Sequence, residues 1–167
     1  HEKRAIEYLQ NAAKLEVNAS DSAEPDENVE VEVKITNVGA GHKIPTGVTE
    51  EREMWLELTV SDSEGKELYH SGALDSKGGI DPEATVYHTV FADTDGKPTV
   101  KVWEAASIFS DNRIGPKESV IEKHSFIMPE NASNPISTKA VLHYRSASQV
   151  HIDELFGEGT YDVPVID

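Results

Sequence analysis

The sequence contains no cysteine among its 167 residues. This absence excludes disulfide bonds, zinc–thiolate sites, cysteine nucleophiles and covalent haem attachment through a CxxCH motif within this chain. The sequence also lacks any apolar run approaching the ~18 residues that a membrane-spanning helix requires, so we expect no membrane span. It shows no signal peptide, and because it begins at His1 without a methionine we expect it to be a processed piece of a longer protein.

Basic residues are scarce relative to acidic ones. The chain carries 15 lysines and arginines against 31 aspartates and glutamates, for a formal net charge of −16. Because nucleic-acid binding requires a basic surface to meet phosphate, this balance argues against a nucleic-acid partner. Catalytic signatures are absent as well, since there is no G-x-S-x-G elbow, phosphate loop or dinucleotide fingerprint. We therefore do not expect the chain to be an enzyme.

Two segments carry helical patterns. In residues 2–15 the apolar positions recur at the spacing of an amphipathic helix, and we assign residues 1–20 to an N-terminal connecting helix. A polar, proline-containing stretch follows and reads as a linker. A second, short helix is expected over residues 149–156, with Ser148 as its N-cap and Gly157 at its end.

Most of the remaining chain shows the two-residue period of half-buried β-strands. Seven segments have an extended pattern: 28–36, 53–62, 67–72, 84–93, 100–109, 118–128 and 138–147. There is no alternation of strands with helices, so the sequence predicts an all-β fold. The specific expectation is an antiparallel, immunoglobulin-like β-sandwich of about seven strands over residues 27–167, with the N-terminal helix and the short C-terminal helix attached. Trp55 and Trp103 are expected to pack in its core.

The stretch NVGAGHKIPTG, residues 37–47, is an unusually constrained loop around a single histidine. We identify five loop-shaping residues: Gly39, Gly41, Pro45, Thr46 and Gly47. The glycines reach backbone angles closed to other residues, and the proline fixes its own φ and extends the residue before it. A loop specified in this way presents the His42 imidazole in one orientation, either as a ligand or acid–base group or as a structural hydrogen-bond donor.

This loop and three later stretches resemble a segment in the C-terminal part of many multihaem c-type cytochromes. The GH-x-x-PTG loop is followed by the strand and turn of REMWLELTVSDSEGKELYHSG, then by SDNRIGPKES and finally by HYRSASQVHIDEL, so that the resemblance covers about residues 28–156. It implies an exported electron-transfer protein whose N-terminal part carries haem c on CxxCH motifs and whose C-terminal part is a β-sandwich. Because this chain has no CxxCH, it would be the non-haem portion of such a protein.

The resemblance also implies partners and a role for the loop. The domain would cap or orient the haem-bearing part of the same protein or of a neighbouring cytochrome subunit. His42 would be a candidate distal axial ligand to a haem held there, because a neutral imidazole nitrogen suits haem iron. The location would be periplasmic, extracellular or at the cell surface.

Two acidic stretches leave a second interpretation open. Asp93 and Asp95 lie in a glycine turn, and Asp111 and Asn112 lie in the SDNR stretch. Calcium prefers hard oxygen ligands of this kind, although the EF-hand pattern is not met and a plain β-turn explains Asp-Gly equally well. The alternative function is thus a calcium-stabilised binding or adhesion module, or a surface-layer interaction module, with no redox role.

Overall fold

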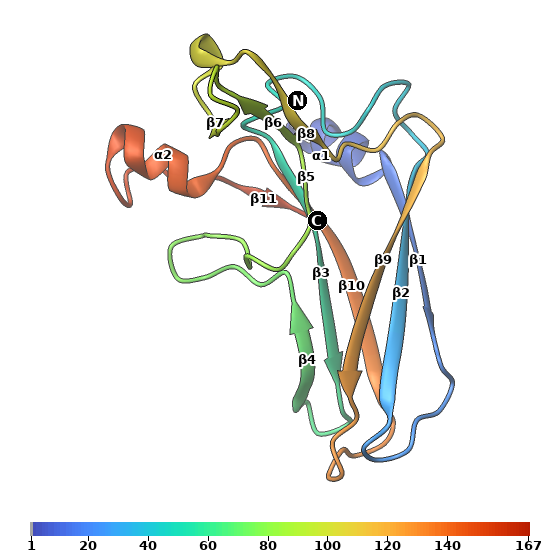
Figure 1. The fold of residues 1–167 in the computed structure, drawn as a ribbon. Helices are drawn as coiled ribbons and strands as arrows, with labels where there is room; N and C mark the ends of the chain where they lie inside the picture. Colours follow the sequence, from blue (N-terminus) through green and yellow to red (C-terminus); the bar gives the residue numbers. More distant parts are fainter. Residues whose placement is uncertain (1) are drawn as a thin grey trace.

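The computed structural model describes residues 2–167, which form two packed antiparallel sheets and a third sheet beside them (Figure 1). The first sheet has the strand order β1-β2-β9, with β1 at Ala13–Ala19, β2 at Asn28–Asn37 and β9 at Ser119–Ile127. The second sheet has the order β11-β10-β3-β4, and β5 also pairs with β3. Its strands are β3 (Glu53–Ser61), β4 (Glu67–Ser71), β5 (Val86–Tyr87), β10 (Ser137–Arg145) and β11 (Val165–Ile166).

The third sheet and the helices complete the chain. The third sheet has the order β7-β6-β8, with β6 at Thr89–Ala92, β7 at Pro98–Thr99 and β8 at Ser107–Asp111. The helices are α1 (Glu2–Gln10), the short 3₁₀ helix η1 (Val102–Glu104) and α2 (Gln149–Phe156). The C-terminal helix therefore lies where the sequence predicts it, between Ser148 and Gly157.

The core lies between the first and second sheets. Alternate residues of β2 point inward, and Val31, Val33 and Ile35 are fully buried there. They pack in one cluster with the inward residues of β3, among them Leu56 and Leu58. This alternation is the pattern that a two-layer antiparallel fold requires, so the predicted all-β sandwich with a helix near each end is confirmed.

The N-terminal helix is shorter than expected. It ends at Gln10, and the chain then forms β1, which pairs along its whole length with β2 from Ala13 opposite Asn37 to Ala19 opposite Val31. The helical prediction for residues 11–15 was therefore wrong, and so was the assignment of residues 11–19 to the connecting helix. Leu15 and its neighbours satisfy a strand pattern as well as a helical one, and the edge of β2 supplies the hydrogen bonds that decide between them. The assignment of residues 1–20 and 27–167 as separate units stays a prediction.

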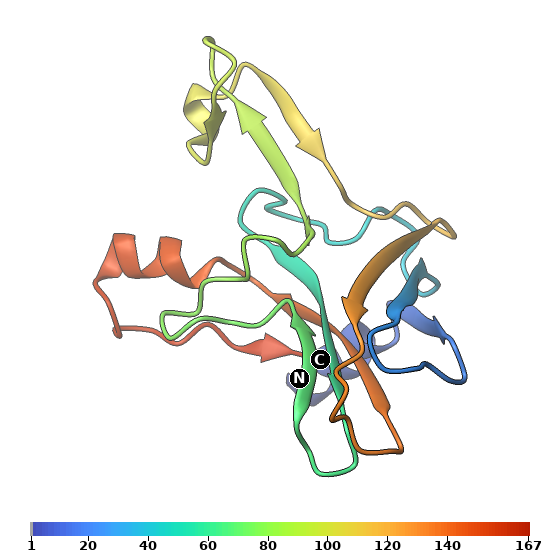
Figure 2. The ribbon, with the colours of Figure 1, turned by 60° about the horizontal axis from the view of Figure 1, so that its bottom comes forward.

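The third sheet projects from the sandwich as a separate lobe (Figure 2). The extended segment predicted over residues 100–109 is divided there between η1 and β8. Trp103 lies in η1 and is 79% exposed, so its predicted place in the core was wrong. The reason is that η1 lies in the projecting lobe, outside the space between the two main sheets.

Trp55 is fully buried, as expected, but on the outer face of the second sheet. Its indole nitrogen donates a hydrogen bond of 3.0 Å to the carbonyl of Gly72, in the segment that follows β4. The ring lies 5.0 Å from the His143 ring and 5.3 Å from the Arg145 guanidinium carbon, both from β10. A second buried layer therefore exists outside the sandwich core.

A polar group also lies inside the sandwich, and it makes stability depend on pH. The Tyr87 hydroxyl donates a 2.5 Å hydrogen bond to the Glu122 carboxylate. Burial outweighs this bond and raises the pKa of Glu122 above its ordinary value of 4.5. The folded chain therefore holds this proton more tightly than the unfolded chain does, and ionisation of Glu122 costs stability as pH rises through that window.

We expect Glu122→Gln to remove this loss because glutamine accepts the same hydrogen bond without a charge. Relative to wild type, the variant should gain stability in urea denaturation series as the pH is raised above 4.5, until Glu122 is ionised in the folded state as well. Glu30→Gln, on the exposed side of β2, is the matched control and should show no such trend. A Glu122→Gln difference from wild type that does not change with pH would contradict this account.

Candidate functional site

The loop that carries His42 is organised by one buried amide. Asn37 is fully buried at the end of β2. Its side-chain nitrogen donates to the carbonyls of His42 at 2.8 Å and Ile114 at 3.1 Å, and its side-chain oxygen accepts from the amide of Ala40 at 3.1 Å. Sequence reasoning did not single out Asn37, although an asparagine directly before a glycine-rich loop is typical of side chains that fix turns.

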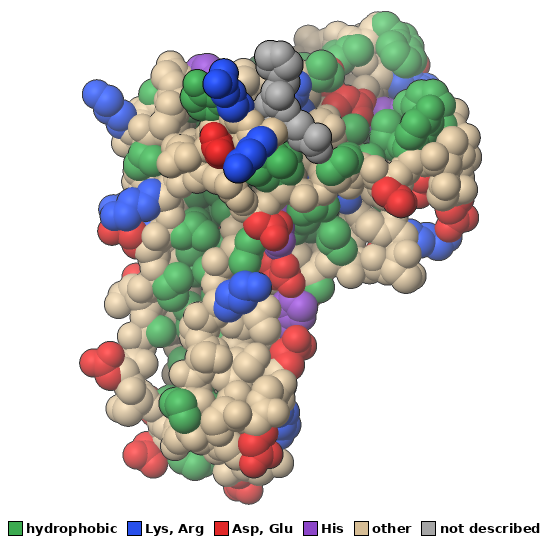
Figure 3. Space-filling view, turned by 180° about the vertical axis from the view of Figure 1, so that it is seen from behind, with side chains coloured by type: hydrophobic (Ala, Val, Ile, Leu, Met, Phe, Trp, Pro, Cys, Tyr) green, Lys and Arg blue, Asp and Glu red, His purple; other side chains and the backbone are tan. Residues whose placement is uncertain are grey.

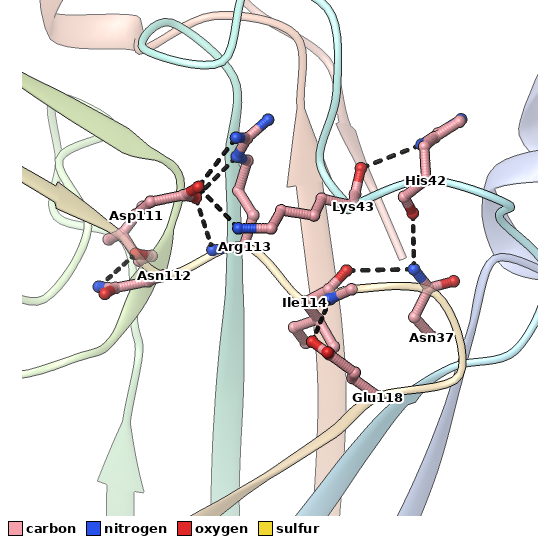
Figure 4. Close-up of polar contacts among 10 residues, drawn as sticks. Asn37, His42, Lys43, Asp111, Asn112, Arg113, Ile114 and Glu118 are labelled. Carbon is pink, nitrogen blue, oxygen red and sulfur yellow. Dashed lines mark hydrogen bonds and ion pairs between the residues drawn. The ribbon is translucent and has the colours of Figure 1, made fainter. Parts of the chain in front are cut away.

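Asn37 and a backbone bridge join the loop to the later SDNRIGPKES stretch (Figure 4). Ile44 and Ile114 exchange backbone hydrogen bonds of 2.9 and 3.0 Å. Arg113 donates two hydrogen bonds, of 2.7 and 2.9 Å, to the Asp111 carboxylate, and Lys43 forms an ion pair with the same carboxylate at 2.9 Å. The Arg113 bonds hold the pKa of Asp111 well below its ordinary value. Two stretches about 70 residues apart thus form one unit.

Two of the loop glycines are required by close approach. A Cβ at Gly39 would lie 2.2 Å from the carbonyl oxygen of Asn11, where the chain leaves α1. Gly47 has a φ of +95°, and a Cβ there would lie 2.8 Å from the Arg52 side chain. Gly41 has open space around it and no positive φ, so its predicted shaping role finds no steric basis. Pro45 is buried after a cis peptide bond, and Thr46 is exposed.

His42 is exposed, and one of its ring nitrogens is already engaged. Nδ1 lies 3.0 Å from the carbonyl oxygen of Lys43, an acceptor, so Nδ1 carries the hydrogen of this bond. In that tautomer Nε2 keeps a lone pair, and in Figure 4 the far end of the ring points away from the labelled residues. The arrangement is the one that metal-binding histidines use, because the second bond fixes the ring and its tautomer.

A cavity of about 570 Å³ opens beside the loop, between α1, the start of β1 and the residues of β3 and β10. Its walls are mainly apolar, with Leu15, Met54 and Leu142 among them, and its polar residues include His42, Arg52 and Tyr144. Figure 3 views this side of the molecule and shows hydrophobic side chains exposed below the N-terminal helix. Cavities of this size with a few convergent polar groups are typical ligand sites.

The four predicted calcium-binding residues do not meet. The Asp93 carboxylate accepts the backbone amides of Asp95 and Lys97, each at 2.9 Å, and so closes its own turn. Asp111 lies at the other end of the β6–β8 pairing and already pairs with Lys43 and Arg113. The Asn112 side chain donates one long hydrogen bond, of 3.5 Å, to the carbonyl of Val86. Residues 2–167 contain no group of three or more histidine, aspartate or glutamate side chains placed to hold a metal ion. The structure therefore offers no support for calcium at this place.

Comparison with known proteins identifies a shared fold. No family model matches the chain, and neither does any curated protein. Among solved structures, the chain is similar to a penta-heme cytochrome c552 from Thermochromatium tepidum, with a TM-score of 0.70 and 22% sequence identity. The match covers 97% of this chain but only 40% of that one. The chain thus has the fold of one part of a multihaem cytochrome.

Within residues 2–167, no helix is both long and apolar enough to cross a bilayer.

Proposed function

We propose that the chain is a non-haem accessory domain of an exported multihaem c-type cytochrome that takes part in electron transfer. The observation that carries this proposal is the shared fold: almost the whole chain corresponds to two fifths of a cytochrome named for five haems, yet the chain has no cysteine to attach one. Haem c would lie in the rest of the parent protein or in a neighbouring cytochrome subunit. The domain caps or orients that region in the periplasm or outside the cell, and has no catalytic activity of its own.

His42 is the residue through which the domain would meet a haem. The Lys43 carbonyl holds its ring, Nε2 is free to bind, and a largely apolar cavity lies beside it. These residues fit the axial position of a haem, and the haem would supply the electron transfer. The part played by this chain is to fix the imidazole, through Asn37 and the bridge to Ile114, before any haem approaches.

Titration with ferric haem tests this role. Wild-type protein should give the spectrum of a low-spin, imidazole-ligated haem, and His42→Ala should lose it, with affinity falling roughly tenfold or more. His151→Ala is the control. His151 is partly exposed, but it is paired with Glu51 at 2.9 Å and lies outside the loop, so this variant should behave as wild type. Equal spectra from wild type and His42→Ala would remove His42 as the ligand.

A further inference from the structure

We propose that Arg52 and Tyr144 form a carboxylate-binding site in the wall of the 570 Å³ cavity, for a ligand whose carboxylate is attached to a large apolar body. Arg52 directly precedes β3, and Tyr144 lies near the end of β10. Both side chains line the cavity, and one guanidinium nitrogen of Arg52 donates a hydrogen bond to the Tyr144 hydroxyl. The hydroxyl can in turn donate its own hydrogen, so the pair presents two kinds of donor to one ligand.

The guanidinium of Arg52 is held in place before any ligand arrives. It lies against the turn at Gly47, where a Cβ would approach Nε to 2.8 Å and the next guanidinium nitrogen to 3.0 Å. Only glycine leaves room for this approach, and the Tyr144 hydroxyl fixes the side chain from β10. A planar, fixed guanidinium is suited to bind a carboxylate because little side-chain freedom remains to be lost.

Arg52 lacks the acidic partner that comparable arginines have. Arg113 is paired with Asp111 at 2.7 Å, and Arg145 is paired with Glu53 at 2.5 Å. Among the side chains that the structure describes, those of residues 3–167, no carboxylate lies within 4.0 Å of the Arg52 side chain, although the full chain has 31 acidic residues. Its Nε is buried and has no acceptor in the described chain. Arg52 as a whole is only partly buried, but a buried Nε without an acceptor is costly, and an external carboxylate would offset that cost.

The rest of the cavity defines the body of the ligand. Apolar side chains from every surrounding element line it, including Leu9, Leu15, Pro45, Met54 and Leu142. The one acidic residue among its lining residues is Asp167, and the carboxylate of Asp167 is bound to His143 at 2.7 Å. The cavity is therefore apolar with a single cationic anchor, in a protein whose net charge is −16. This combination selects an amphipathic carboxylate over a neutral or cationic molecule.

Two sources supply that chemistry. One is the propionate of a haem presented by the haem-bearing region, and this source rests on the proposed function. The other is a free amphipathic carboxylate such as a fatty acid. The site itself does not depend on iron ligation by His42, because Arg52 and Tyr144 can bind a carboxylate without the Nε2 nitrogen of His42.

Binding of metal-free protoporphyrin IX, followed by its fluorescence, tests the site without any contribution from iron ligation. The diacid should bind wild-type protein roughly tenfold or more tightly than its dimethyl ester, because only the diacid offers a charge-assisted hydrogen bond to Arg52. The same comparison between decanoate and decanol, by calorimetry, covers the free-carboxylate source. Arg52→Gln should abolish the preference for the acid. Lys123→Gln, which alters an exposed cation outside the cavity, should retain it.

Each outcome either supports or overturns the proposed carboxylate-binding site. An Arg52-dependent preference for the porphyrin diacid supports the haem source, and an Arg52-dependent preference for decanoate alone supports the site while removing that source. Equal binding of acids and neutral analogues by wild-type protein would overturn the site, and needs no variant. A preference that survives in Arg52→Gln would also overturn it. Should Arg52→Gln fold poorly, Arg52→Lys keeps the charge without the planar fork and should retain only part of the preference.

Discussion

Replacing Arg145 with alanine is expected to lower the free energy of unfolding by about 3–5 kcal/mol, the cost of leaving one partner of a buried ion pair alone. Arg145 is 2% exposed, at the end of β10. Its Nε donates to the Glu53 carboxylate at 2.5 Å, and another guanidinium nitrogen donates to the Gly78 carbonyl at 2.6 Å. The guanidinium also lies over the Trp55 ring. Removing the guanidinium leaves the Glu53 carboxylate without its cation and the Gly78 carbonyl without this donor, and it removes the contact with the Trp55 ring.

Denaturation by urea measures this effect, and two further variants separate its causes. Lys123→Ala removes a cation that is itself 71% exposed and is paired with Glu32, so it should cost no more than about 1 kcal/mol. Adding Glu53→Gln to Arg145→Ala should recover part of the loss, because the stranded charge is then gone. A cost for Arg145→Ala no larger than that for Lys123→Ala would show that the outer layer contributes little. Equal stability of the single and double variants would show that packing on Trp55, rather than charge, is decisive.

The existence of this outer layer was beyond the reach of the sequence pattern. The alternation in β3 correctly predicts which residues face the sandwich core, because a strand places successive side chains on opposite faces. The same alternation places Trp55 on the opposite face, which conflicts with the expectation that Trp55 packs in the core. The indole is instead bonded to Gly72, and Arg145 on the same face is bonded to Gly78, in a segment that no local pattern places there. Contacts of this kind depend on the path of a loop, and a loop has no regular alternation of apolar and polar residues from which its path could be predicted.

The same limit explains what was and was not predicted of the site. The glycines, the proline and His42 are adjacent in sequence, so their loop could be recognised as constrained before its shape was known. Arg52 and Tyr144 are 92 residues apart, and only the pairing of β10 with β3 brings them together. The resemblance to known motifs showed the order of the motifs along the chain, but it did not show that Arg52 and Tyr144 lie in contact. The strand β1 was missed for a related reason, since its partner edge on β2 lies outside its own sequence window.

Replacing Asn37 with alanine is expected to lower the free energy of unfolding by about 3 kcal/mol and to loosen the loop that holds His42. The amide is fully buried, and alanine leaves the His42 carbonyl and the Ala40 amide without their Asn37 partner. The Ile114 carbonyl loses one of its two donors and keeps the Ile44 amide. The matched control is Asn112→Ala, which removes an exposed amide with a single 3.5 Å contact and should cost less than about 0.5 kcal/mol.

The two consequences of Asn37→Ala can be measured separately, and together they connect stability to function. Urea denaturation reports the lost hydrogen bonds, whereas titration with ferric haem at low temperature, where the variant remains folded, reports the orientation of His42. Weakened haem ligation in folded Asn37→Ala, with unchanged ligation in Asn112→Ala, would show that the buried amide positions the imidazole. Full ligation by a destabilised Asn37→Ala would show that the bridge between Ile44 and Ile114 suffices to place the ring, and that Asn37 serves the fold alone.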